Sequence, residues 1–170
     1  MKLRKIAARA FGVVSIAVAT IVGTSGIASA APAPAAGLWG LNGGQIPVVG
    51  QHAWCNGVVD MYFDTDPTRP AHGTITLVSR GMNGADPDWS ANPKCKVDFT
   101  IIWYDGVFPF HHTVKVPTEF GVEPGETVTT EINPGSGLIY LTAGATYIDT
   151  DTWGFVPQYS YPASGYFLIP

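Results

Sequence analysis

The sequence predicts an all-β protein: a single antiparallel β-sandwich of about seven or eight strands that follows a cleaved signal peptide. Apolar and polar residues alternate over several short segments, which is the period of a half-buried strand. Glycine and proline, which favour turns, separate these segments, and the chain contains 20 glycines and 14 prolines. After residue 30, no segment repeats apolar residues at helical spacing for three turns, so we expect no helix longer than a turn or two.

The first thirty residues have the layout of a secretory signal peptide. Four basic residues come first, at Lys2, Arg4, Lys5 and Arg9. An apolar segment at residues 11–22 follows, and Ala28, Ser29 and Ala30 form a small-residue cleavage site. We expect cleavage after Ala30 and a secreted, extracellular product. A retained membrane anchor is the alternative, but the apolar run is short and polar residues interrupt it, and no later stretch is long enough for a span.

Removal of the signal peptide makes the chain strongly acidic. Five basic residues then stand against all 13 acidic residues, a net charge near −8, whereas the whole chain has −4. Nucleic acids and anionic membrane surfaces require a basic surface, so the composition argues against both as partners. A neutral or basic partner remains compatible with this charge.

The remaining residues, about 140 in number, suffice for one domain. Residues 31–50 are rich in alanine, proline and glycine and read as a leader, with an irregular strand in its second half, and residues 51–170 read as the sandwich domain. Two cysteines remain, Cys55 and Cys95, and an exported protein allows them to form a disulfide. A free catalytic thiol is the alternative, although neither flank supplies an evident base.

The strand expected at the centre of the core is residues 95–104, with four apolar side chains on one face: Val97, Phe99, Ile101 and Trp103. Other expected strands are residues 57–63, 74–79, 112–116, 127–132 and 138–143, with two weaker ones at 147–150 and 165–169. Residues 81–93 read as a long loop. Pro117 is expected to end its strand because proline cannot donate to a sheet ladder.

A resemblance to known proteins rests on the Pro124-Gly125-Glu126-Thr127 turn and the alternating Thr and Val residues that follow it. This pattern resembles the immunoglobulin-like β-sandwich modules of bacterial surface and secreted proteins. The leader after the cleavage site is similar to that of small exported actinobacterial proteins. Trp103 departs from antibody domains, since it lies eight residues after the second cysteine rather than between the two. The strand topology therefore cannot be transferred.

Several polar clusters are candidates for metal or catalytic sites. Three Asp-x-Asp triplets start at Asp64, Asp86 and Asp149, and such carboxylates could bind calcium or simply occupy solvated turns. His111 and His112 are adjacent, so they point to opposite faces of a strand and are poorly placed to share one metal ion. Ser136 lies between glycines but lacks the strand-to-helix turn of a hydrolase nucleophile. We assign no catalytic residue, no metal and no cofactor.

Aromatic residues in loops provide the strongest functional hint. We assign ligand contact to Trp89, Trp153, Tyr159 and Tyr161, since flat rings bind partners at low entropic cost, although they could instead cover the open ends of the core. The prediction is a secreted, disulfide-stabilised, non-catalytic protein that binds a protein or a cell-envelope component. The alternatives are a small secreted hydrolase with dispersed carboxylates and an outer-envelope β-barrel.

Overall fold

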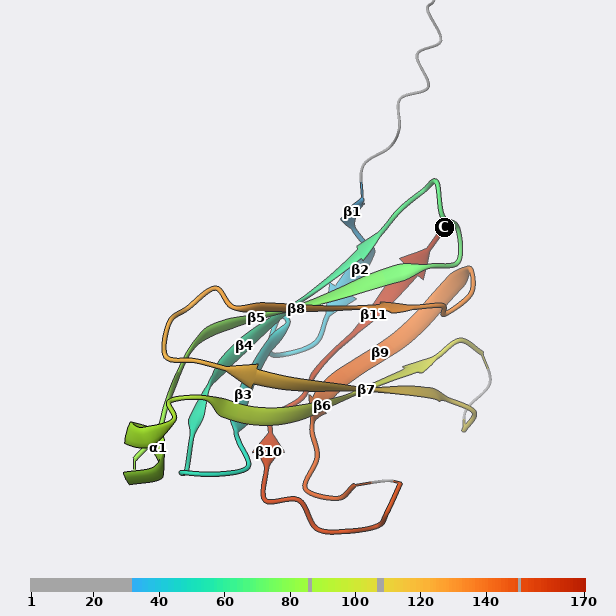
Figure 1. The fold of residues 1–170 in the computed structure, drawn as a ribbon. Coiled ribbons are helices and arrows are strands. Elements are labelled where there is room, and N and C mark those ends of the chain that lie inside the picture. The colour runs from blue at the N-terminus through green and yellow to red at the C-terminus, as the bar shows by residue number, and fades with distance from the viewer. Residues whose placement is uncertain (1–31, 86, 107–108, 150) are drawn as a thin grey trace, which may run out of the picture.

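The computed structural model describes residues 32–170 except 86, 107–108 and 150, so the expected signal peptide lies outside the described residues. Most of the described chain forms two antiparallel sheets (Figure 1). The larger sheet has the order β10 (Tyr159–Ser160), β3 (Gln45–Val49), β4 (Asn56–Thr65), β5 (Gly73–Asn83) and β8 (Thr127–Ile132), and β1 (Ala33–Pro34) also pairs with β4. The second sheet has the order β2 (Ala36–Trp39), β11 (Ala163–Ile169), β9 (Gly137–Ala145), β6 (Cys95–Tyr104) and β7 (His112–Phe120).

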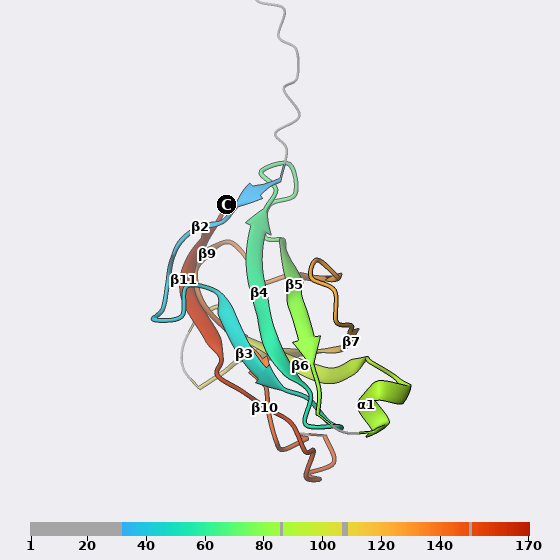
Figure 2. The ribbon, with the colours of Figure 1, turned by 90° about the vertical axis from the view of Figure 1, so that its left-hand side faces the viewer.

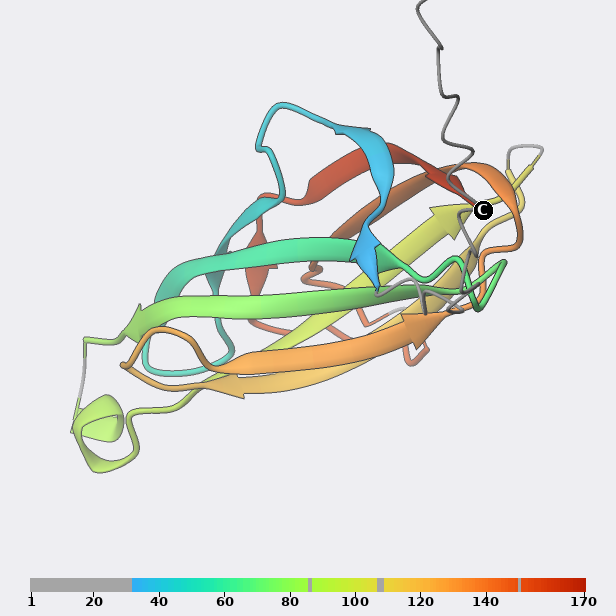
Figure 3. The same cartoon turned by 90° about the horizontal axis from the view of Figure 1, so that it is seen from above.

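The two sheets form a β-sandwich-like arrangement. Figure 2 looks onto the larger sheet, with β4 and β5 in front of β6, β7 and β9, and Figure 3 shows the molecule from above. Alternate residues of both sheets enter one core cluster, whose largest fully buried side chains include Phe99, Phe120, Phe167, Ile75 and Leu77. The all-β prediction is confirmed, and strand 95–104 has its predicted bounds and inward face.

The predicted loop at residues 81–93 is partly wrong. Strand β5 continues to Asn83, and residues Pro87–Ala91 form a short helix, α1. Within the described part of the chain, no helix is long and apolar enough to cross a membrane. The weak strand expected at 147–150 is also not formed among its described residues, where a single bridge joins Ile148 to Phe155.

Pro117 does not end its strand, as the sequence had suggested. It lies inside β7 and pairs with Asp98 of β6. Because β7 is the edge strand of the second sheet, the proline nitrogen can face away from the ladder, and no inter-strand hydrogen bond is lost.

The strand expected in the second half of residues 31–50 is formed as β3, and the described residues before it also add β1 and β2. Strand β3 pairs with β4 and β10, and β2 pairs with β11. The physical reason is apolar burial: Ile46 and Val48 lie in the core, and the Trp39 ring packs edge-on against Phe167 with centroids 4.8 Å apart. The two sheets therefore begin before residue 51.

The predicted disulfide is confirmed. Cys55 and Cys95 are bonded, with their Cα atoms 5.6 Å apart, and both are fully buried. Cys55 directly precedes β4 of the larger sheet, and Cys95 begins β6 of the second sheet. The bond therefore links the two sheets at one end of the molecule.

Candidate binding site at the aromatic end

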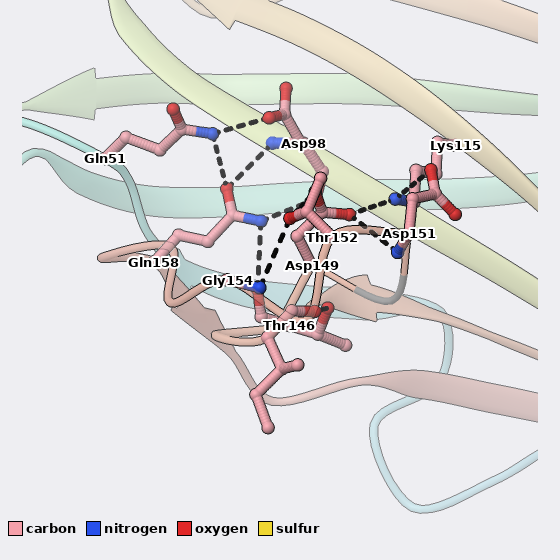
Figure 4. Close-up of polar contacts among 10 residues, drawn as sticks. Gln51, Asp98, Lys115, Thr146, Asp149, Asp151, Thr152, Gly154 and Gln158 are labelled. Atoms are coloured by element: carbon pink, nitrogen blue, oxygen red, sulfur yellow. Dashed lines mark hydrogen bonds and ion pairs between the residues drawn. The ribbon is translucent and has the colours of Figure 1, made fainter.

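Two loops meet at the end of the molecule that carries the disulfide. Residues 50–55 connect β3 to β4, and residues 146–158 connect β9 to β10. Gln51 Nε2 joins them, because it donates to Gln158 Oε1 at 3.0 Å and to Asp98 Oδ2 at 2.7 Å (Figure 4). Both loops are thereby connected to β6.

Gln158 fastens the longer loop to the end of a sheet ladder. The pairing of β9 with β6 ends at Phe99, so the main chain of Asp98 has no strand partner on that side. The Gln158 side chain replaces it: Asp98 N–H donates to Gln158 Oε1, and Gln158 Nε2 donates to the Asp98 carbonyl, both at 2.9 Å. Gln158 is only 5% exposed and also donates to the Thr146 carbonyl, so these main-chain groups stay paired after burial.

A second anchor comes from Lys115 on β7. Its Nζ donates to Asp149, and to Asp151 at 2.6 Å (Figure 4). The Asp149 carboxylate also accepts from Thr152 Oγ1 at 2.7 Å. The Lys115 hydrogen bond, followed by the Thr152 hydrogen bond, holds the pKa of Asp149 well below its ordinary value of 3.8. Hydrogen bonds to both carboxylates raise the pKa of Lys115, so Lys115 is charged at neutral pH and its ion pairs with the two carboxylates persist there.

The loop also has internal order. Asp149 N–H donates to the Gly154 carbonyl at 2.9 Å, and Trp153 N–H donates to the Asp149 carbonyl at 2.7 Å. Together with the bridge between Ile148 and Phe155, these bonds fold the loop back on itself. These bonds hold the described residues on either side of position 150 together, and the Trp153 side chain is exposed to solvent.

Five aromatic side chains that are half or more exposed belong to these loops or follow them directly. We call this group the aromatic end: Trp54, Tyr147, Trp153, Phe155 and Tyr159, with Trp153 at 81% and Trp54 at 78% exposure. Both tryptophans have positive φ, 47° for Trp54 and 56° for Trp153, in the left-handed region that bulky residues rarely adopt. Main-chain strain of this kind clusters at functional sites, where the surrounding structure maintains it.

Two adjoining hollows lie between the longer loop and the outer face of the second sheet. The first, about 350 Å³, is lined by polar and charged residues that include Lys96, Asp98, Lys115 and Asp149. The second, about 280 Å³, has more apolar walls that include Ile102, Tyr147, Tyr159 and Pro162. They share Thr100 and Thr146, so together they offer a polar and an aromatic half.

Asp98 borders the polar hollow, and one of its carboxylate oxygens is buried without a donor. Asp98 Oδ1 is buried and has no hydrogen-bond partner among the described residues, whereas Oδ2 accepts from Gln51. A buried carboxylate oxygen needs a donor to offset its lost hydration. Because Oδ1 has no accessible surface, a ligand in the polar half would reach it only after the Asp98 side chain moved.

The structure brings some of the predicted contact residues together. Trp153 and Tyr159 belong to the aromatic end, and Tyr161, at 57% exposure, follows β10 directly. Trp89 lies on α1, where it is partly buried and packs against the core. Sequence reasoning missed Trp54 and Tyr147. Trp54 could have been identified as exposed from its position in a short polar loop, directly before a cysteine expected to form a disulfide.

The other acidic clusters have structural partners. Asp66 accepts hydrogen bonds from the N–H and hydroxyl of Thr68, as expected for a turn carboxylate. Asp88 lies in the first turn of α1, and Asp86 lies outside the described residues. Among the described residues, no group of three or more His, Cys, Asp or Glu side chains could hold a metal ion.

The candidate catalytic residues are separated from one another. His112 stacks on Trp103 and contacts Asp105 at 3.0 Å, and the Ser136 hydroxyl donates to the carbonyl of Pro170 at 2.8 Å. Both described cysteines are in the disulfide. None of these groups lines the two hollows.

Comparisons of the chain with protein-family models, with curated proteins and with solved structures find no match. The function is therefore inferred from the chemistry of the aromatic end and of the two hollows beside it.

Proposed function

We propose that this protein is exported and binds a partner outside the cell, a protein or a component of the cell envelope, through the aromatic end and without catalysis. The observation that supports this best is the exposure of five large aromatic side chains on anchored loops. A folded protein gains by burying such rings, so a cluster of them left in water favours a contact surface.

The anchoring of the loops favours binding energetically. A partner that docks on a mobile loop must overcome the conformational entropy of ordering it, whereas Gln158, Lys115 and the disulfide already fix these loops. Tryptophan and tyrosine add large contact areas with few rotatable bonds. The aromatic end thus resembles a pre-organised contact surface.

The charges indicate what kind of partner fits. The chain after residue 30 has a net charge near −8, which attracts a basic partner at long range and does not repel a neutral one. Lys96 lines the polar hollow and can donate a hydrogen bond there. A partner that presents an apolar surface next to hydroxyl or amide groups would match both halves of the site.

The carboxylates in the hollow support the non-catalytic proposal. Hydrolysis by paired carboxylates needs one of them to remain protonated near neutral pH, which requires a raised pKa. The pKa of Asp149 is instead lowered, and its oxygens are occupied by Lys115 and Thr152. Glu131 lies on the larger sheet and is bound by Arg69 at 2.8 Å.

Export and fold type belong to the same proposal. The disulfide favours an oxidising compartment. The chain passes from one sheet to the other between β5 and β6, between β7 and β8, and between β8 and β9, as in the Greek-key connections of immunoglobulin-like domains. Intact mass of the purified product tests export: a chain that starts at Ala31 is expected, and an unprocessed Met1 chain would contradict it.

Binding is tested by capture. The full chain, expressed for export so that the disulfide forms, is immobilised and exposed to envelope fractions of the producing organism. The same is done with Phe155→Ala and with the matched control Phe110→Ala, because the two phenylalanines are almost equally exposed, at 77% and 76%, but only Phe155 belongs to the aromatic end.

We expect a component that is retained by the unaltered chain and by Phe110→Ala but at least about tenfold less by Phe155→Ala, since truncation of a hot-spot aromatic costs about 2 kcal/mol or more. Circular dichroism spectra of all three proteins must agree. Equal retention by both variants would refute the role of the aromatic end.

A further inference from the structure

The outer face of the second sheet is divided into two unlike halves. Loop 146–158 covers the half that carries Lys96 and Asp98. On the other half, exposed or half-buried leucine and tyrosine side chains stand in place of the polar residues usual on the solvent face of an antiparallel sheet. We call them the tyrosine–leucine face: Leu38, Tyr104, Leu138, Tyr140, Tyr166 and Leu168.

Strand register arranges this face in two parallel rows. The first row runs across four strands, with Leu38 beside Tyr166, Tyr166 beside Tyr140, and Tyr140 beside Tyr104. Neighbouring tyrosine rings are in contact, with centroids 5.0 Å and 6.0 Å apart. The second row places Ala36 beside Leu168 and Leu168 beside Leu138. Strands β2, β9 and β11 each contribute one residue to each row, two positions apart along the strand, so the two rows lie about 7 Å apart.

The composition of this face is that of an interface core. Leu38, Leu138 and Leu168 are 78%, 66% and 57% exposed, and Tyr166 is 55% exposed. Neither row contains a charged residue, although the chain after residue 30 carries a net charge near −8. Together the six side chains present on the order of 500 Å² of surface, a patch size that marks interaction sites. With a polar rim, it approaches the roughly 800 Å² that each subunit of a standard interface contributes.

We propose that this face binds a second copy of the chain, with the two second sheets packed face to face. A two-fold axis that runs parallel to the rows and between them places each row over the other row of the second copy. Tyr140 then lies over Leu138 of the second copy, and Tyr166 lies over its Leu168. These two rings each meet an aliphatic side chain, whereas Tyr104 has no second-row residue opposite it. The facing sheets lie about 10 Å apart.

Charge explains why the copies meet here. Two chains of the same sign repel each other, and the uncharged face is where they can approach with the least repulsion. The aromatic ends lie on other parts of both copies and remain accessible. The dimer would therefore present two binding ends, which strengthens attachment to a surface with repeated partner sites.

Sedimentation velocity of the full chain, expressed for export, tests the proposal over a dilution series. We expect a dimer that dissociates on dilution. Leu168→Arg should weaken dimerisation at least about hundredfold, because it places a charge in a closed apolar contact. The matched control, Thr129→Arg, adds the same charge at an exposed position on β8 of the other sheet and should leave the dimer intact.

A charge-swap experiment tests the geometry. Leu138→Lys and Tyr140→Glu should each be monomeric alone. Mixing them should restore a one-to-one dimer, because the introduced lysine of one copy would face the introduced glutamate of the other. Near-ultraviolet circular dichroism confirms that both variants remain folded.

Two outcomes of these experiments would overturn the proposal: a monomer at every concentration, or a dimer that Leu168→Arg leaves unchanged. Retention of a purely monomeric chain on a polysaccharide column would also overturn the proposal, and it would assign the tyrosine–leucine face to glycan binding.

Discussion

Removing the disulfide should cost much of the stability of this protein. Cys55 and Cys95 are 40 residues apart in the chain, and their bond restricts the unfolded state. For a closed loop of this length, the chain-entropy relation gives a contribution of about 4 kcal/mol at 25 °C. This is a large part of the roughly 5–15 kcal/mol typical of a whole domain.

The assay is chemical unfolding of the full chain and of the double variant Cys55→Ala/Cys95→Ala, followed by tryptophan fluorescence. We expect the free energy of unfolding to fall by about 4 kcal/mol and the melting temperature to fall by roughly 10 °C. The double variant avoids a lone thiol, which could form bonds between molecules. Urea and thermal unfolding should agree if the transition is two-state.

A loss below about 1 kcal/mol would contradict this prediction, because it would mean that the bond does not restrict the unfolded ensemble as the chain-entropy relation requires. Mass spectrometry of the unaltered protein must show both cysteines oxidised for this comparison to be valid.

Three further predictions concern the anchors of the aromatic end. The pKa of Asp149 is lower in the folded state than its ordinary value of 3.8, so its carboxylate stabilises the loop above pH 3.8, and this effect is lost as pH falls through the lowered pKa. In an NMR titration, Lys115→Met should return the pKa of Asp149 toward 3.8. An unchanged pKa would argue against the ion cluster. Gln158→Leu should lower the free energy of unfolding by about 2–3 kcal/mol, since it leaves buried main-chain groups of Asp98 unpaired; urea midpoints equal to those of the unaltered protein would count against this role. Gly50→Ala should cost about 1–3 kcal/mol, because a Cβ there would clash with both disulfide sulfurs, and a variant of unchanged melting temperature would show that the site can relax.

Much of the fold could be predicted from the sequence because burial follows local alternation. Strand β6 has one face of wholly apolar residues, and its bounds matched the prediction. Strand β8 likewise alternates as expected after the Pro124-Gly125 turn. The disulfide followed from the presence of only two cysteines in the expected secreted product.

The errors arose where tertiary context decides. Whether proline interrupts a strand depends on whether that strand lies at an edge, which the local sequence around Pro117 does not state. Strands β1 and β2 are short and rich in small residues, and they are extended because β4 and β11 pair with them. The Ile148 segment is extended for only one bridge, since Asp149 turns the chain to reach Lys115.

The candidate site was predicted only in part, for the same reason. Trp153 and Tyr159 were identified from their aromatic type and loop position. Their connection to loop 50–55 depends on Gln51 and Gln158, which are 107 residues apart in the chain. No local pattern marks such a pair, so Trp54 was overlooked.

The most direct test of the central claim is amide chemical-shift mapping of the isotope-labelled protein during titration with the captured envelope component. We expect the largest shifts in residues 50–55 and 146–161, with no change at the outward residues of β4 and β5. Shifts centred on β4 and β5, with the aromatic end unaffected, would contradict the claim.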